Sequence, residues 1–100
     1  MKGDTTTYAK AEKVNAVSIF PNPFNSYTTL EYELLNYSNV CIELYNNMGE
    51  KIKELQKTTL LPGKYHLTIK DEDMTASGLY YVRIISDNEV RTFKLWHLKE

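Results

Sequence analysis

The chain has 100 residues, of which 42% are hydrophobic, and its formal net charge is −1. This length and hydrophobic content fit one small domain with a buried core, and they exclude wholesale disorder. A net charge so close to zero gives no overall field that would attract nucleic acid or an anionic membrane, and no apolar run approaches the roughly 18 residues of a membrane span. The single Cys41 cannot form an internal disulfide, so cysteine does not identify the compartment.

Residues 1–15 are polar, and we expect them to form a linker ahead of a domain that spans residues 16–100. The first residues lack the apolar stretch of a secretory signal peptide. Either the protein is cytoplasmic or this chain is a piece of a longer one.

The first alternation of apolar residues, at residues 17–20, stops at two prolines. Pro21 and Pro23 fix two φ angles and remove two backbone donors, which predicts a rigid extended corner. We expect the flanking Phe20 and Phe24 to anchor this corner in the core.

Six further segments alternate with the period of two that is typical of strands with one buried face. They cover residues 28–34, 40–45, 51–57, 65–69, 78–85 and 90–98. The segment at 51–57 is the weakest, because Ile52 and Leu55 are three apart, which predicts a bulge or an edge strand. The side chains predicted to face inward are Leu30, Tyr32, Leu34, Val40, Ile42, Leu44, Tyr65, Leu67, Ile69, Tyr80, Val82, Ile84, Phe93 and Leu95.

Glycines mark the turns between these segments. We expect Gly49 or a neighbouring asparagine to adopt the left-handed conformation in a tight reversal, and Gly63 to close a turn. Gly78 opens the strand at residues 78–85, and we expect a positive φ or a close backbone approach there. In that strand, which we take as the central one, Tyr80 carries the largest buried side chain.

About seven strands at intervals of 8–12 residues, with no convincing helix, predict an all-β fold. The fold class we expect is a seven-stranded antiparallel immunoglobulin-like β-sandwich. The Cys–Trp–Cys pattern of antibody domains is absent, so the comparison with immunoglobulins concerns architecture alone.

Catalytic patterns are missing from the sequence. His66 and His97 lie on different predicted strands, and we interpret His66 as a solvated strand residue. Cys41 lies between two apolar residues, where cysteines are more often inert, although pairing with a histidine stays open. The acidic residues 71–73 lack the spacing of a calcium loop and favour a solvated loop. We therefore predict no enzyme and no catalytic, cofactor or metal site.

Two surface features remain. Trp96, Tyr81 and Tyr45 form a candidate aromatic platform for a sugar, although the more frequent role of such residues is to cover the sheet or to contact a neighbouring domain.

Arg83, Arg91, Lys94 and Lys99 form a candidate basic stripe along the last two strands. A solvated face is the default interpretation of such a stripe, and a docking surface is the sharper one.

Several motifs in order resemble one known family. The sequence resembles the C-terminal sorting domain of type IX secretion cargo, from Bacteroidota and relatives, over about residues 16–99. The matching stretches are residues 19–25 (IFPNPFN), 44–49 (LYNNMG), 61–65 (LPGKY), 76–83 (ASGLYYVR) and the lysine-bearing last strand at 92–95 (TFKL).

This resemblance implies a seven-stranded β-sandwich that acts as a signal rather than a catalyst, with no cofactor. The cargo would cross the inner membrane with its own signal peptide, and an outer-membrane translocon and its shuttle protein would recognise the folded domain. The cargo would reach the cell surface or the medium through the periplasm. A surface sortase is a further partner in many members, and it would cut in or near residues 1–15. The chain would then be a piece of a longer precursor.

The resemblance also assigns roles to residues. Those matching the family motifs and expected to set the shape are Pro21, Asn22, Pro23, Phe24, Gly49, Gly63, Tyr65, Gly78 and Tyr80. Arg83, Lys94 and Lys99 are the candidates for partner contact. The chain departs from the family at Asn46 and Glu50, where Asp and Arg or Lys are usual, and its end is less basic than in many members.

Two rival hypotheses remain. The first is an accessory binding or spacer module of an extracellular enzyme, with carbohydrate binding as one version of this hypothesis. The second, an enzyme in its own right, is the least favoured. We expect a monomer, in which edge strands provide a route to pairing between copies.

Overall fold

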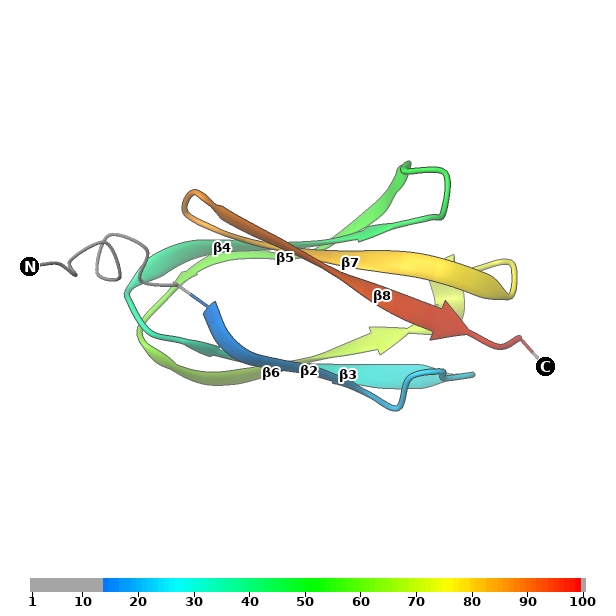
Figure 1. Cartoon of the computed structure of the whole chain (residues 1–100), viewed down its shortest axis with the longest axis horizontal. Helices are drawn as coiled ribbons and strands as arrows, with labels where there is room; N and C mark the ends of the chain where they lie inside the picture. Colours follow the sequence, from blue (N-terminus) through cyan, green and yellow to red (C-terminus); the bar gives the residue numbers. More distant parts are fainter. Residues whose placement is uncertain (1–13, 100) are drawn as a thin grey trace, which may run out of the picture.

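The computed structural model describes residues 14–99, which form two packed β-sheets (Figure 1). The smaller sheet has the strand order β2-β3-β6 and the larger one β5-β4-β7-β8. All ladders between these strands are antiparallel. The elements are β2 (Val14–Phe20), β3 (Tyr27–Leu34), β4 (Ser38–Tyr45), β5 (Lys51–Leu60), β6 (Gly63–Lys70), the single 3₁₀ turn η1 (Asp71–Asp73), β7 (Gly78–Ser86) and β8 (Glu89–His97). The predicted seven-stranded antiparallel β-sandwich is confirmed.

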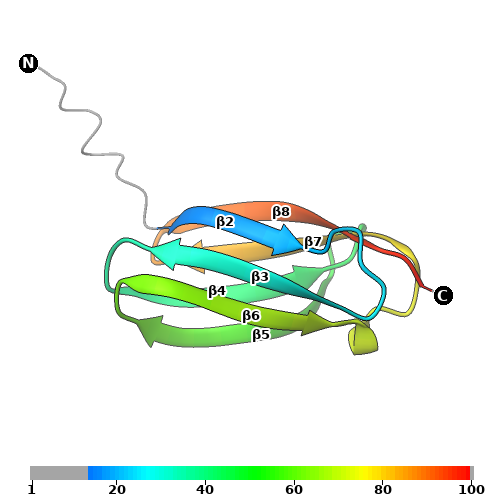
Figure 2. The ribbon, with the colours of Figure 1, turned by 90° about the horizontal axis from the view of Figure 1, so that it is seen from below.

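The chain enters and leaves this sandwich at opposite ends of its long axis. In Figures 1 and 2, β2 begins at one end and the chain leaves β8 at the other. The second end also holds the loops 21–26, 46–50 and 71–77, and we call these loops together with residues 97–99 the C-terminal pole. Within the described residues, no helix is long and apolar enough to span a membrane.

The core lies between the inner faces of the two sheets, as the alternation predicted. Most of the predicted inward side chains are fully buried, and Tyr65, Leu67 and Phe93 are half-buried and pack against them. Val14 and Met74 join the core without having been predicted. The weak strand β5 lies at the edge of its sheet, and its register with β4 is irregular at two points, which confirms the expected bulge and edge.

Strand β2 differs most from its prediction. It begins at Val14, which is buried, and its register with β3 shifts between Asn15 and Ser18, where Ala16 has a φ of 46°. Beyond the bulge Ile19 turns toward the core, so its neighbour Phe20 points to the opposite side and is 78% exposed. The prediction that Phe20 anchors the corner in the core is therefore wrong.

Candidate functional site

The segment that follows β2 closes the outer edge of the last strand. The Asn22 side chain accepts a hydrogen bond from the Trp96 N–H (2.9 Å) and donates one to the Lys94 carbonyl (3.0 Å). The backbone of Phe24 continues the pattern, because its N–H donates to the Trp96 carbonyl (3.0 Å) and its carbonyl accepts from the Leu98 N–H (2.8 Å). A side-chain amide carries the same donor and acceptor as a peptide group, so Asn22 substitutes for a strand residue along β8.

The two prolines around Asn22 suit this arrangement. Neither Pro21 nor Pro23 has a backbone N–H, so neither adds an unpaired donor beside the edge. The Pro21 carbonyl accepts a hydrogen bond from the Thr28 hydroxyl (2.6 Å), which ties the segment to β3. Residues 21–24 therefore cover the outer edge of β8, which would otherwise offer free backbone groups for pairing with other chains. We call this the Asn22 cover.

Behind this cover, a fully buried histidine holds the C-terminal pole together. The His97 ring packs against Phe24 and Tyr80, with ring centroids 5.1 Å and 6.1 Å apart. Its Nδ1 lies 3.1 Å from the Ala76 carbonyl oxygen and its Nε2 lies 3.2 Å from that of Asn25. The Tyr80 hydroxyl donates to the same Ala76 carbonyl (2.7 Å). His97 thus links β8 to two loops.

Sequence reasoning gave His97 no role. The signal was available, since His97 continues the inward series of Phe93 and Leu95 at a spacing of two. Gly78, at the entrance to β7, has the expected positive φ, at 134°. A Cβ at this position would meet no atom within 4 Å, so the backbone conformation rather than lack of space accounts for the glycine.

The outer side of the larger sheet brings together the candidate aromatic and basic residues. Tyr45 pairs across strands with Tyr81, and Tyr81 pairs with Lys94. Trp96, which is 44% exposed, occupies the next outward position of β8. We call this surface, made of Tyr45, Tyr81, Arg83, Thr92, Lys94 and Trp96, the β7–β8 face.

A shallow notch of about 240 Å³ lies in the β7–β8 face. The Arg83 guanidinium lies over the Tyr45 ring, 4.6 Å from its centroid, and covers that face of the ring. The Arg83 Nε is buried and has no hydrogen-bond partner. The residues that line the notch are Tyr45, Gly49, Tyr81, Arg83 and Thr92.

Beside the notch, the buried carboxylate of Glu43 is already satisfied. Its oxygens accept from the Tyr45 hydroxyl (2.7 Å) and from Lys51 Nζ (3.1 Å). The Tyr45 hydrogen bond is the main cause that lowers the pKa of Glu43 below its usual 4.5, and Lys51 adds to this effect while burial opposes it. The same hydrogen bond raises the pKa of Tyr45.

The four basic residues do not form one stripe. Arg83 and Lys94 share the β7–β8 face, but Arg91 lies on the opposite side of β8. There its guanidinium packs on Phe93 (5.2 Å) and donates to the Val14 carbonyl (3.0 Å). Arg91 therefore takes part in holding the start of β2.

Lys99 lies apart from the other basic residues, at the C-terminal pole. Its backbone N–H donates to the Ser77 hydroxyl (2.6 Å), next to Gly78.

The two departures from the family pattern meet in the turn after β4. Asn46 Oδ1 accepts from the N–H groups of Met48 and Glu50, both at 2.9 Å, and Asn46 Nδ2 donates to the Glu50 carboxylate (2.8 Å). Gly49 has a φ of 84°. The Asn46 amide and the Glu50 carboxylate thus form a hydrogen-bonded pair that closes this turn, so the two departures from the family pattern fit each other.

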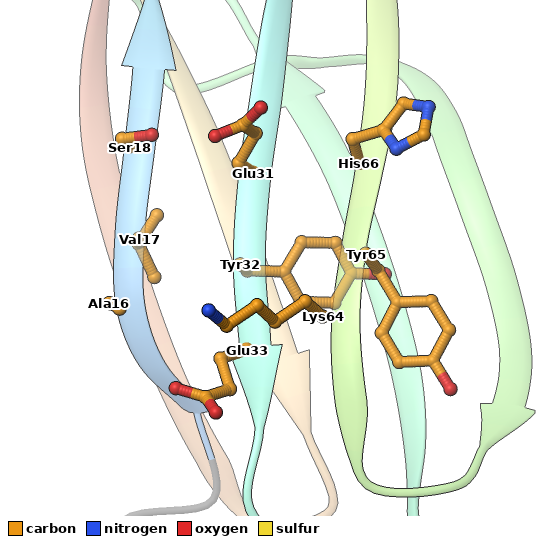
Figure 3. A pocket seen from close by; sticks show the side chains of 9 residues that line it. All are labelled: Ala16, Val17, Ser18, Glu31, Tyr32, Glu33, Lys64, Tyr65 and His66. Carbon is orange, nitrogen blue, oxygen red and sulfur yellow. The ribbon is translucent and has the colours of Figure 1, made fainter.

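A second hollow, of about 510 Å³, opens beside the bulge of β2 (Figure 3). Its charged residues alternate along β3 and β6, where Glu31 pairs with His66 and Glu33 with Lys64. His66 is exposed, as predicted. Below them the Tyr65 ring stacks on Tyr32 at 5.8 Å, and the Tyr65 hydroxyl donates to the Leu61 carbonyl in the turn that Gly63 closes (2.7 Å). The acidic and basic residues that line this hollow are thus Glu31, Glu33, Lys64 and His66.

The acidic residues after β6 and the thiol of Cys41 are the remaining groups that the sequence suggested as reactive. Asp73 and Glu72 pair with Lys53, at 2.9 Å and 3.6 Å. Burial is the main cause that raises the pKa of Cys41, which disfavours the reactive thiolate. Among residues 14–99, no group of three or more His, Cys, Asp and Glu side chains is arranged to hold a metal ion.

Comparison with known proteins identifies the family. Among solved structures, the chain is similar to the Ig1 domain of mouse SynCAM 2, with a TM-score of 0.48 and 11% identity, covering 83% of this chain and 93% of that one. Comparison with curated proteins gives no match. The family model described as "Secretion system C-terminal sorting domain" matches residues 18–97, which include the loops 21–26, 46–50 and 71–77 and the β7–β8 face. The chain belongs to the family of secretion system C-terminal sorting domains.

Proposed function

We propose that this domain directs a larger exported protein through the type IX system, across the outer membrane, to the cell surface or the medium. The match of the family model over residues 18–97 carries the proposal. In this role the domain is a non-catalytic signal, and its partners are the outer-membrane translocon and its shuttle protein. A surface sortase that cuts in or near residues 1–15 is a further partner.

The shape of the sandwich supports this role. Because β2 starts at the end opposite the C-terminal pole, a passenger joined ahead of Val14 would lie away from the pole (Figure 2). The pole would then stay accessible to the secretion machinery. Two of the candidate contact residues lie near this end, Lys99 on the pole itself and Lys94 beside the Asn22 cover.

The test is a transport assay in a bacterium with a type IX system. A signal peptide and a fluorescent passenger are placed before residues 1–100, and the control carries the passenger without the domain. We expect fluorescence at the surface or in the medium only when the domain is present. Equal retention of both passengers in the periplasm, with the domain folded, would contradict the proposal.

The accessory sugar-binding module remains the alternative, because Trp96 and Tyr81 lie on one exposed face. Tyr45 contributes little to such a platform, since Arg83 covers its ring and its hydroxyl is bonded to Glu43. Titration with cell-wall and plant polysaccharides distinguishes the two functions. Saturable shifts of the Trp96 and Tyr81 resonances would favour the sugar-binding module, and unchanged resonances would exclude it.

A further inference from the structure

We propose that the notch in the β7–β8 face is a carboxylate-binding subsite, in which Arg83 receives an aspartate or glutamate side chain of a partner protein. The inference rests on the proposed function, since it gives the chemistry with which the secretion machinery would recognise this domain.

The first observation is the unpaired nitrogen of Arg83. Its Nε is buried and bonds to no atom, whereas buried polar groups in folded proteins nearly always have a partner. The stack on Tyr45 holds the guanidinium in place but leaves this donor unused. Because Nε is shielded from solvent, a carboxylate in the notch would bond to the outer Nη groups of the same guanidinium, whose N–H donors suit its oxygens.

The second observation is the charge balance of the face. The charge of Glu43 is already matched by Lys51, with which it forms an ion pair at 3.1 Å. Within residues 14–99, neither Arg83 nor Lys94 forms an ion pair, and the two occupy diagonal positions on neighbouring strands. Thr92, directly opposite Arg83, adds a hydroxyl donor to the same notch. Glu43 lies directly opposite Arg83 on β4, but its carboxylate is bonded to Lys51 and Tyr45, so the two positive charges around the notch form no ion pair of their own within the described residues.

The surroundings favour a protein partner over a sugar. The Tyr45 ring is covered by the Arg83 guanidinium and cannot stack on a sugar ring. Exposed Trp96, half-buried Tyr81 and Arg83 are the residue types that dominate binding energy at protein interfaces. A notch of about 240 Å³ accommodates a single carboxylate side chain, with the flat sheet around it left for the rest of the interface.

The test uses nuclear magnetic resonance, because the Arg83 Nε–H gives a resonance of its own. The full chain is titrated with an acetylated pentapeptide that has glutamate at its centre, and in parallel with the same peptide carrying glutamine. We expect a saturable shift of the Arg83 Nε–H with the glutamate peptide alone, weakened by added salt. Arg83→Lys should bind at least tenfold more weakly with an unchanged melting temperature, and Lys57→Gln, an exposed charge on β5, should bind as the wild type does.

Three results would overturn the subsite. These are no shift at Arg83, equal shifts with the glutamate and glutamine peptides, and tighter binding of oligogalacturonate or inorganic phosphate than of the peptide. If the passenger is transported while Arg83 does not respond, the subsite is wrong and the sorting role stands. If the peptide binds while the domain directs no transport, the subsite stands and the proposed function is wrong.

Discussion

The C-terminal pole and the β7–β8 face lie next to each other and differ in how their polar groups are used. Around the pole, the Asn22 amide and the Tyr80 hydroxyl bond to backbone groups, and the two ring nitrogens of His97 face backbone carbonyl oxygens, with the Asp71 carboxylate 3.6 Å from Nε2. On the face, Arg83 and Lys94 lack ion-pair partners within the described residues. Polar groups that bond within the domain favour its stability, whereas charges without an internal partner favour binding to another protein. We therefore assign stability to the C-terminal pole and recognition to the β7–β8 face.

Neighbouring tyrosines of β7 give the largest expected effect. Tyr80 is buried beside the pole, so Tyr80→Ala should cost about 3–5 kcal/mol of unfolding free energy. Tyr81 points to the β7–β8 face, so Tyr81→Ala should cost about 1 kcal/mol or less. Urea unfolding of both variants measures the difference. Equal losses would remove the distinction between the two regions.

Gly78, the first residue of β7, tests the backbone beside the pole. Because its φ is 134°, Gly78→Val should cost about 1–3 kcal/mol through backbone strain. Gly78→Ala should also destabilise through the positive φ, although no neighbouring atom would contact the added Cβ. Thermal unfolding provides the measurement, and an unchanged melting temperature for both variants would show that the positive φ is wrong.

Asn22 tests the edge cover. Asn22→Ala removes two solvent-exposed hydrogen bonds to β8, and we expect a loss of about 1 kcal/mol. It also frees the edge, so self-association should increase in analytical ultracentrifugation. Asn22→Asp keeps the acceptor for the Trp96 N–H and should lie between the wild type and the alanine variant. An Asn22→Ala variant that stays monomeric and fully stable would contradict the role of the cover.

The smallest expected effect concerns how the free energy of unfolding decreases as the pH is lowered. The pKa of Glu43 is lowered in the folded state, so its contribution is fully present above the usual 4.5 and is lost as the pH falls through the lower, folded value. Glu43→Gln should therefore reduce the loss of stability on acidification. Unfolding curves between neutral pH and pH 3 measure this, and identical acid dependence of the two proteins would exclude Glu43 as a contributor.

Local alternation explains why most of the fold could be predicted. Leu30, Tyr32 and Leu34 are buried because a period of two places them on one face, and the same rule identified the edge irregularity of β5. The same rule places Phe20 outward, because Val17 and Ile19 pack against the core, so the error lay in expecting Phe20 to anchor the proline corner. No local pattern marks the bulge near Ala16, because the residue with positive φ is alanine rather than glycine.

The site was less predictable, because it depends on contacts between distant parts of the chain. The Asn22 amide meets β8 more than 70 positions away, and nothing near Asn22 indicates this. By contrast, the alternation along β8 could have separated the basic residues. With Phe93 facing inward, a period of two places Arg91 on the same side and Lys94 on the opposite side. The unpaired Arg83 Nε depends on side-chain packing and has no signature in the sequence.

The most direct test of the account measures secretion when the β7–β8 face is changed and the pole is left intact. The fluorescent passenger is joined to the wild-type domain, to the double variant Arg83→Gln with Lys94→Gln, and to Lys57→Gln as the control. All three domains should unfold at similar temperatures. We expect the wild type and the control to reach the surface or the medium while the double variant remains in the periplasm. Export of the double variant at the wild-type level would contradict it.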